Sequence, residues 1–158
     1  MKQPTLLPII AGLFLGWSSF AEAGGLYLYE LGTEDVGLAN AGAAARAQDA
    51  STIATNPAGM TKLAGNQLTL GVQVLYGDVD YTMSDAGQVG PGNVIGLFPG
   101  ASTFYSHSVN DDLKLGVALF GNYGLSLSYG ESWAGHYLVK DATLMGITLQ
   151  PSIAYRIN

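Results

Sequence analysis

The groups with the most obvious potential for chemistry in this 158-residue sequence are two histidines and the serines beside one of them. Ser106-His107-Ser108 places a base between two hydroxyls, the combination used in nucleophilic hydrolysis. Neighbouring residues of a strand point to opposite faces, however, so His107 is badly placed to activate either serine. His136 lies far along the chain, and two separated histidines make no metal signature. We expect no catalytic residue and no metal site, and an acyl hydrolase centred on His107 is a less favoured alternative.

Two other ligand-binding motifs are incomplete. Asp78-Val79-Asp80 lacks the further oxygen ligands of a calcium loop. Gly90-Pro91-Gly92, followed by Gly96, misses the dinucleotide-binding fingerprint by one residue and opens no helix. The sequence contains no cysteine, which excludes thiolate metal sites and disulfides. We therefore expect no cofactor.

The composition excludes other classes of protein. The 12 acidic and 6 basic residues give a net charge of −6, and no basic stripe is available for nucleic-acid phosphates. Only 11% of the residues are charged and 22 are glycine, whereas about a quarter of the residues of an ordinary soluble protein are charged. This composition is typical of a membrane β-protein and predicts no nucleic-acid partner.

The first 23 residues have the layout of a signal peptide. Lys2 precedes an apolar run over residues 6–17, which at 12 residues is shorter than the roughly 20 that a membrane-spanning helix needs. Ala21-Glu22-Ala23 then supplies the small residues of a cleavage site. We predict a mature chain that starts at Gly24.

The mature chain divides into two regions that would have to position any functional group. Residues 24–66 are rich in alanine and glycine and show no amphipathic stripe, which predicts a hatch (a plug) of short helices and loops. From residue 67 onward apolar residues recur at every second position, as in strands. The runs begin at Gln67, Leu113 and Met145, and a weaker one covers residues 101–109.

The length of these runs and of their connections predicts a membrane barrel. Three of the four runs extend over about 15 residues, against 5–6 in a typical soluble sheet. A tight turn at residues 110–112 alternates with long connections over residues 83–99 and 130–142, as in outer-membrane proteins. We expect an all-β fold, a transmembrane antiparallel β-barrel of which residues 67–158 form the first four strands. Because about eight strands are needed for closure, we expect the sequence to be either the N-terminal part of a longer chain or the product of a truncated reading frame.

Several motifs in fixed order carry a resemblance to a known family. The most distinctive is Asn56-Pro57-Ala58 within residues 50–60, shortly before the first strand. Others are the mature start at residues 24–31, Gly37-Leu38-Ala39-Asn40-Ala41-Gly42, Asp49-Ala50, Gly121-Asn122-Tyr123-Gly124 in the third strand, and residues 154–158. The mature chain resembles the first third of the FadL/TodX-type outer-membrane transporters for long-chain fatty acids and hydrocarbons.

The resemblance implies a fourteen-stranded barrel with an N-terminal hatch and passive transport without chemistry. It places Gly24, Gly25 and Leu26 at a ligand pocket, Asn56, Pro57 and Ala58 in the hatch, and a kink at Gly121, Asn122, Tyr123 and Gly124. Ligand would leave sideways through the gap that this kink makes in the wall. The implied partners are a hydrophobic small molecule, outer-membrane lipid and the barrel-assembly machinery. The alternative is a structural or adhesive outer-membrane barrel.

Pro151 stands inside the predicted fourth strand, although proline cannot donate a hydrogen bond to a ladder. A hairpin centred near His136 would place Pro151 opposite Gly121 and residue 150 opposite Asn122. We expect the third strand to turn inward there, so that Pro151 loses no partner and helps to keep the gap open. A simple bulge around a neutral proline is the equal alternative.

Overall fold

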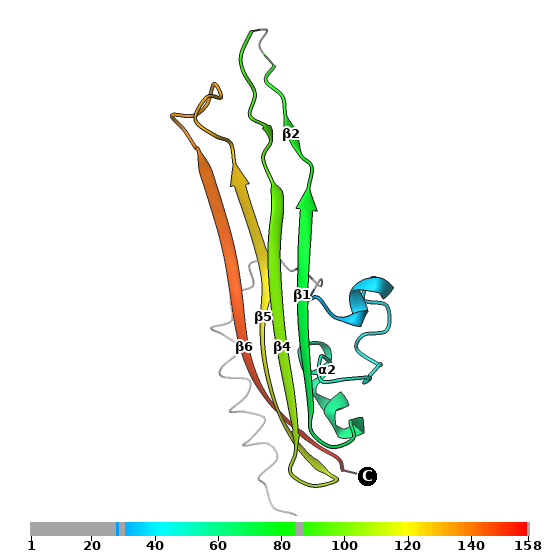
Figure 1. Ribbon diagram of the computed structural model, residues 1–158. Coiled ribbons are helices and arrows are strands. Elements are labelled where there is room, and N and C mark those ends of the chain that lie inside the picture. Colours follow the sequence, from blue (N-terminus) through cyan, green and yellow to red (C-terminus); the bar gives the residue numbers. More distant parts are fainter. Residues whose placement is uncertain (1–27, 29–30, 85–86, 158) are drawn as a thin grey trace, which may run out of the picture.

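The computed structural model describes residues 28, 31–84 and 87–157, which form a few short helical turns and an antiparallel sheet (Figure 1). The helical elements are η2 (Glu34–Leu38), α2 (Thr52–Thr55) and η3 (Pro57–Lys62). The strands are β1 (Gln67–Gly77), β2 (Asp80–Tyr81), β3 (Gly92–Asn93), β4 (Gly96–Ser108), β5 (Leu113–Ser128) and β6 (Asp141–Tyr155). Among the described residues, no helix is long and apolar enough to cross a membrane.

The four long strands pair in the order β1-β4-β5-β6, all antiparallel. β2 and β3 pair only with each other, inside the connection from β1 to β4. The prediction of an all-β chain with four long strands is confirmed. Two boundaries were predicted wrongly, because β4 starts at Gly96 rather than Ala101 and β6 at Asp141 rather than Met145.

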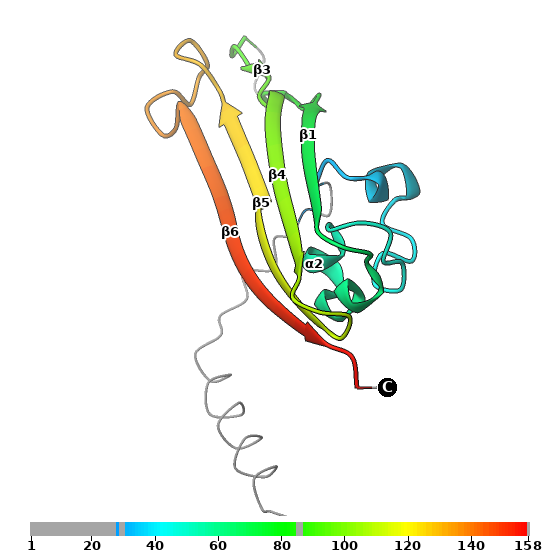
Figure 2. The ribbon, with the colours of Figure 1, turned by 60° about the horizontal axis from the view of Figure 1, so that its bottom comes forward.

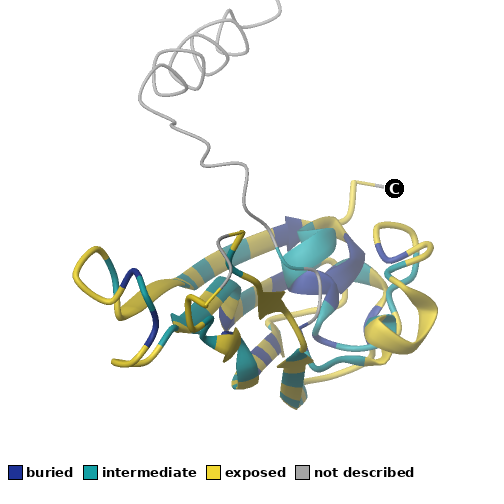
Figure 3. Cartoon of the chain, turned by 90° about the horizontal axis from the view of Figure 1, so that it is seen from above, coloured by how far each residue is buried: buried dark blue, intermediate teal, exposed yellow. Residues whose placement is uncertain are grey.

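The two faces of the sheet differ in what covers them. Residues 31–66 lie against one face, which we call the covered face, and the opposite one is the bare face (Figure 2). Figure 3 shows the resulting alternation of exposed and buried bands along the strands. The exposed apolar side chains of the bare face include Leu68, Leu70, Val72, Val74, Tyr76, Leu97, Tyr105, Leu115, Val117, Leu119, Met145, Ile147, Leu149, Ile153 and Tyr155. Such an apolar face requires an apolar environment.

The core lies between residues 50–63 and the lower half of the sheet, the half that contains the turn from β4 to β5. Ile53, Met60 and Phe104 are completely buried, and the rings of Phe104 and Phe120 stack at 6.0 Å. Small residues on β5 make room for this layer: a Cβ atom on Gly116 would lie 2.9 Å from Ile53 Cδ1. Burial of these side chains therefore fixes α2 and η3 on the sheet.

Polar contacts hold the same segment to the strands. Gln150 Nε2 donates to the carbonyl oxygen of Ile53 at 2.7 Å, and the Ser102 hydroxyl donates to the carbonyl oxygen of Leu31. At Leu31–Gly32 the chain crosses β1 so closely that a Cβ atom on Gly71 would lie 2.6 Å from the Gly32 carbonyl oxygen. Residues 31–66 are thus attached to the sheet at both of their ends and in the core.

Candidate functional site

The pairing between β4 and β5 covers only the lower half of these strands. Within the described residues the ladder runs from Ser108–Lys114 to Ser102–Phe120 and stops there. Above this point β4 continues its ladder with β1, and β5 continues its ladder with β6. We call the space between residues 95–101 and 121–127 the strand gap.

β5 carries an irregularity at the beginning of the strand gap. Gly121 pairs with Ile147 and Tyr123 pairs with Gly146, so that Asn122 is an extra residue without a position in the β5–β6 ladder. Such a bulge bends its strand and redirects the neighbouring side chains. The Asn122 carbonyl oxygen accepts a hydrogen bond of 2.7 Å from the backbone N–H of Leu28. The bulge therefore contacts the segment that precedes the core of the N-terminal region.

The bulge also reverses which side chains of β5 point to which face of the sheet. Below it, Leu115, Val117 and Leu119 lie on the bare face, as the alternation predicts. Above it, Leu125 pairs with Leu144 and Leu127 with Ala142, two positions of β6 that share the covered face with Gly146 and Thr148. The alternation resumes at Leu125 and Leu127 on the opposite face, because one inserted residue reverses the face of all that follow.

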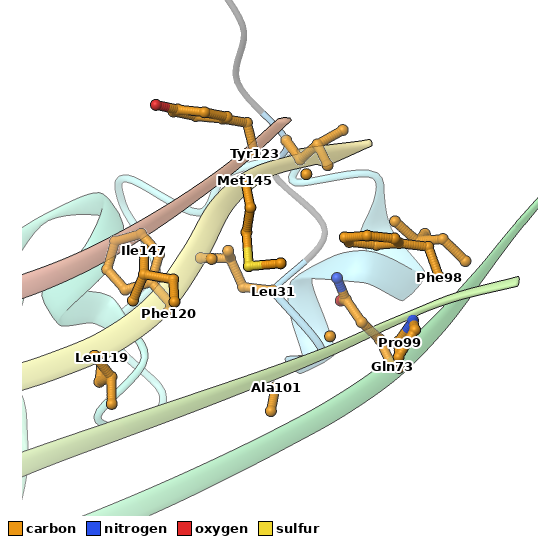
Figure 4. A pocket seen from close by; sticks show the side chains of 15 residues that line it. Leu31, Gln73, Phe98, Pro99, Ala101, Leu119, Phe120, Tyr123, Met145 and Ile147 are labelled. Atoms are coloured by element: carbon orange, nitrogen blue, oxygen red, sulfur yellow. The ribbon is translucent and has the colours of Figure 1, made fainter. Parts of the chain in front are cut away.

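Two apolar pockets lie at this place. One, of about 300 Å³, is lined from both faces of the sheet, with Leu31 and Phe98 from the covered face and Pro99 and Leu119 from the bare face. It therefore passes between the strands, and Figure 4 shows Phe98, Leu31 and Met145 projecting into the space where β4 and β5 diverge. The other, of about 450 Å³, is lined by Leu28, Tyr123, Gly124, Leu125, Leu127, Ala142, Thr143 and Leu144. Leu28, Tyr123 and Gly124 belong to both pockets. Linings of this kind suit an apolar ligand.

Asn56, Pro57 and Ala58 lie apart from the strand gap, on the turn between α2 and η3. The backbone of Asn56 lies outside the helical region, as expected before a proline (φ −154°, ψ 86°), and Pro57 starts η3. The Asn56 side chain donates from Nδ2 to the carbonyl oxygen of Ala44 at 2.7 Å, and its own carbonyl oxygen accepts from Gly59 N–H at 2.8 Å. The motif thus ties the loop before α2 to the helical turn that buries Met60 in the core.

The other predicted site residues have different outcomes. Gly24, Gly25 and Leu26 lie outside the described residues, but Leu28 lines both pockets. The four residues Gly121, Asn122, Tyr123 and Gly124 lie together at the bulge. All of them except Asn122 also line the smaller pocket.

The predicted register of Pro151 was wrong. Pro151 pairs with Val117, and Gly121 pairs with Ile147. The ladder ends on the β4 side of β5, whereas β5 and β6 stay paired around the bulge. Pro151 is consequently in the fully paired lower half, and its partner on β5 lies four residues before the predicted one.

The histidines and serines do not come together. Ser106 is completely buried on the covered face, whereas His107 is exposed on the bare face and stacks on Tyr105. His136 contacts the Trp133 carbonyl oxygen through Nδ1 at 2.9 Å, in the connection between β5 and β6.

Phe98, Met145 and the apolar residues above the bulge were not predicted as site residues. The sequence carried no local signal for them, because Gly124, Ser126 and Ser128 fit an unshifted alternation with Leu125 and Leu127 equally well.

Comparison with known proteins identifies the family to which this architecture belongs. Residues 14–158 match the family model of the outer membrane protein transport proteins (OMPP1/FadL/TodX). The chain belongs to this family. The resemblance deduced from the motifs is thereby confirmed, and the OMPP1/FadL/TodX chain described here is a protein of the bacterial outer membrane.

Individual members of the OMPP1/FadL/TodX family match over most of the chain. Outer membrane protein P1 of Haemophilus influenzae strain Rd is 33% identical over 155 residues, which cover 87% of this chain and 34% of that protein. The long-chain fatty acid transport protein of Escherichia coli K12 is 29% identical over 145 residues, which cover 89% of this chain and 32% of that protein. The chain spans about a third of the length of the curated relatives it matches.

Proposed function

We propose that the protein carrying this chain moves hydrophobic compounds passively across the outer membrane, with long-chain fatty acids, alkanes or aromatic hydrocarbons as ligands. Residues 67–157 form the first strands of its barrel wall, and residues 24–66 form a hatch inside it. The printed name of the E. coli relative, a long-chain fatty acid transport protein, supports this ligand class. No chemical step is involved.

The observation that carries the proposal is the apolar pocket that passes through the sheet where the β4–β5 ladder stops. A ligand bound against Leu28 and Tyr123 lies where the two pockets meet, and it competes there for space with the Leu28 side chain. Withdrawal of Leu28 breaks the Leu28–Asn122 hydrogen bond and frees the way sideways through the strand gap. Asn56, Pro57 and Ala58 hold the rest of the hatch in place during this rearrangement.

The test is to remove the bulge without altering the pocket chemistry. Deletion of Asn122 from the complete chain that carries this sequence joins Gly121 to Tyr123 and turns Leu125 and Leu127 to the bare face. We expect uptake of a radiolabelled long-chain fatty acid to fall to the level of cells without the transporter, while heat-modifiable gel mobility shows normal assembly.

The matched control is Asn122→Ala, which keeps the bulge and the backbone carbonyl that Leu28 contacts. This variant should retain uptake. Equal uptake by the deletion variant and the unchanged protein would contradict release through the strand gap, and a parent without any uptake would favour the structural or adhesive barrel.

A further inference from the structure

Contacts between its two edges close the strand gap at both of its ends, and both contacts belong to the same pairing register. Its lower end is the Ser102–Phe120 pair, and at its upper end the N–H of Ser128 donates to the carbonyl oxygen of Val94 at 2.8 Å. Seven residues lie between the lower and the upper end on each edge, 95–101 on the β4 side and 121–127 on the β5 side, so the two chains separate and meet again in the same register. The strand gap is therefore a window in the sheet, with a rim on all sides.

The upper rim is held by the long connections on either side. Tyr129 stacks on Trp133 at 5.1 Å, and Tyr81 contacts both rings edge-on at 6.2 and 6.0 Å. We call these three residues the aromatic clamp. Ala134 N–H also donates to the carbonyl oxygen of Val89 at 3.1 Å, and the Trp133 indole donates from Nε1 to Val139 at 2.9 Å. Trp133, a member of the aromatic clamp, is only 7% exposed.

Because both ends are held, the width of the window depends on the side chains at its edges. The β5 edge offers little bulk at two positions, Gly121 and Gly124, but the β4 edge carries Phe98. Phe98 and Gly124 each lie four residues above the Ser102–Phe120 pair, directly across the window. A Cβ atom on Gly124 would lie 2.7 Å from Phe98 Cε1 and Cζ, so the ring reaches across the window to the glycine. Figure 4 shows the Phe98 side chain in the space between β4 and β5.

We propose that Phe98 is a specificity-determining residue for lateral passage. Its ring divides the window and leaves room for a slim, flexible alkyl chain, whereas a rigid ligand of several fused rings must displace the Phe98 ring against a fixed frame. Glycine at position 124 is required because any side chain there would occupy the place of the ring. The inference rests on the proposed function, since it concerns the route through the strand gap.

The test compares two acids that differ only in bulk. Cells that lack their own fatty-acid transporter express the complete chain, and initial uptake rates are measured for hexadecanoic acid and for a pyrenyl-decanoic acid. Phe98→Ala should raise the ratio of bulky to slim uptake at least about threefold, with the rate for hexadecanoic acid little changed. Leu97→Ala is the matched control, because Leu97 is 71% exposed on the bare face and lines neither pocket.

The outcomes separate the two proposals. If the unchanged protein takes up no more hexadecanoic acid than cells without it, transport itself is refuted. If it takes up hexadecanoic acid but Phe98→Ala and Leu97→Ala give the same ratio as the parent, the role of Phe98 is refuted and transport stands. Should Phe98→Ala fail to assemble, Phe98→Leu removes the flat ring but keeps apolar bulk, and a raised ratio supports the proposal while an unchanged one overturns it.

Discussion

Phe98 and Phe104 lie on the same face of the same strand, six residues apart, in very different surroundings. Phe104 is completely buried between the N-terminal segment and β5, with its ring stacked on Phe120. Phe98 lies where β4 has separated from β5, and its ring lines a pocket. The lower half of the sheet is thus built to hold the N-terminal region in place, whereas the upper half leaves space. Under the proposed function, the lower half of these two strands provides stability and the upper half provides passage.

The strongest test of this difference between the two halves is to replace each phenylalanine by alanine. Phe104→Ala should lower the free energy of unfolding by about 3–5 kcal/mol, because it leaves a cavity in a closed core. Phe98→Ala should cost less than about 1 kcal/mol, since its ring already borders open space. Denaturant unfolding of the complete chain in detergent measures both values, and equal losses would show that the two halves are packed alike.

A pair of glycines sharpens the same contrast. Gly71→Ala in the lower half would bring a methyl group to 2.6 Å from the Gly32 carbonyl oxygen. The N-terminal segment must then move away from β1, at a cost of about 1–3 kcal/mol. Gly121→Ala is the control at the strand gap, where the nearest atom to the new Cβ is the Gly146 carbonyl oxygen at 3.6 Å. Unfolding curves should separate the two variants, and a milder effect for Gly71→Ala would contradict the close crossing.

The smallest effect is expected at Pro151. Because Pro151 pairs with Val117 in the lower half, its replacement should leave the strand gap unaltered. Pro151→Ala should keep uptake at the parental rate and change the unfolding free energy by no more than about 0.5 kcal/mol. A change in the uptake rate with unaltered stability would restore a role for Pro151 in the gap.

The fold could be predicted from the sequence as far as local patterns determine it. Alternation at every second residue identified the long strands, and the order of small motifs identified the family. The start of β4 was missed because Pro99 and Gly100 are turn-forming residues. They are tolerated there because β4 has lost its β5 neighbour, and proline is accepted at such an edge.

The site was harder to predict because it depends on contacts between distant parts of the chain. Nothing local distinguishes Asn122 as an extra residue from Asn122 as an ordinary strand position; the choice is fixed by the pairing of β6 on either side of it. The register of Pro151 likewise depends on the conformation of residues 129–140, which hold the aromatic ring contacts of Trp133. Phe98 acquires its position only through Gly124 across the gap.

In the proposed barrel, the bulge at Asn122 also lies at a defined depth in the membrane. Apolar bare-face positions run over nine residues in β1 (68–76) and in β5 up to the bulge (113–121), and over eleven in β6 (145–155). These lengths are close to the roughly 9–11 residues with which a tilted strand crosses hydrocarbon. Above the bulge the same face carries Ser126 bonded to Thr143 at 3.0 Å and Ser128 bonded to the Asp141 carboxylate at 2.7 Å. A carboxylate is not tolerated among lipid tails. In the proposed barrel, a single extra residue therefore sets the level at which this hairpin leaves the acyl chains and enters the headgroup layer.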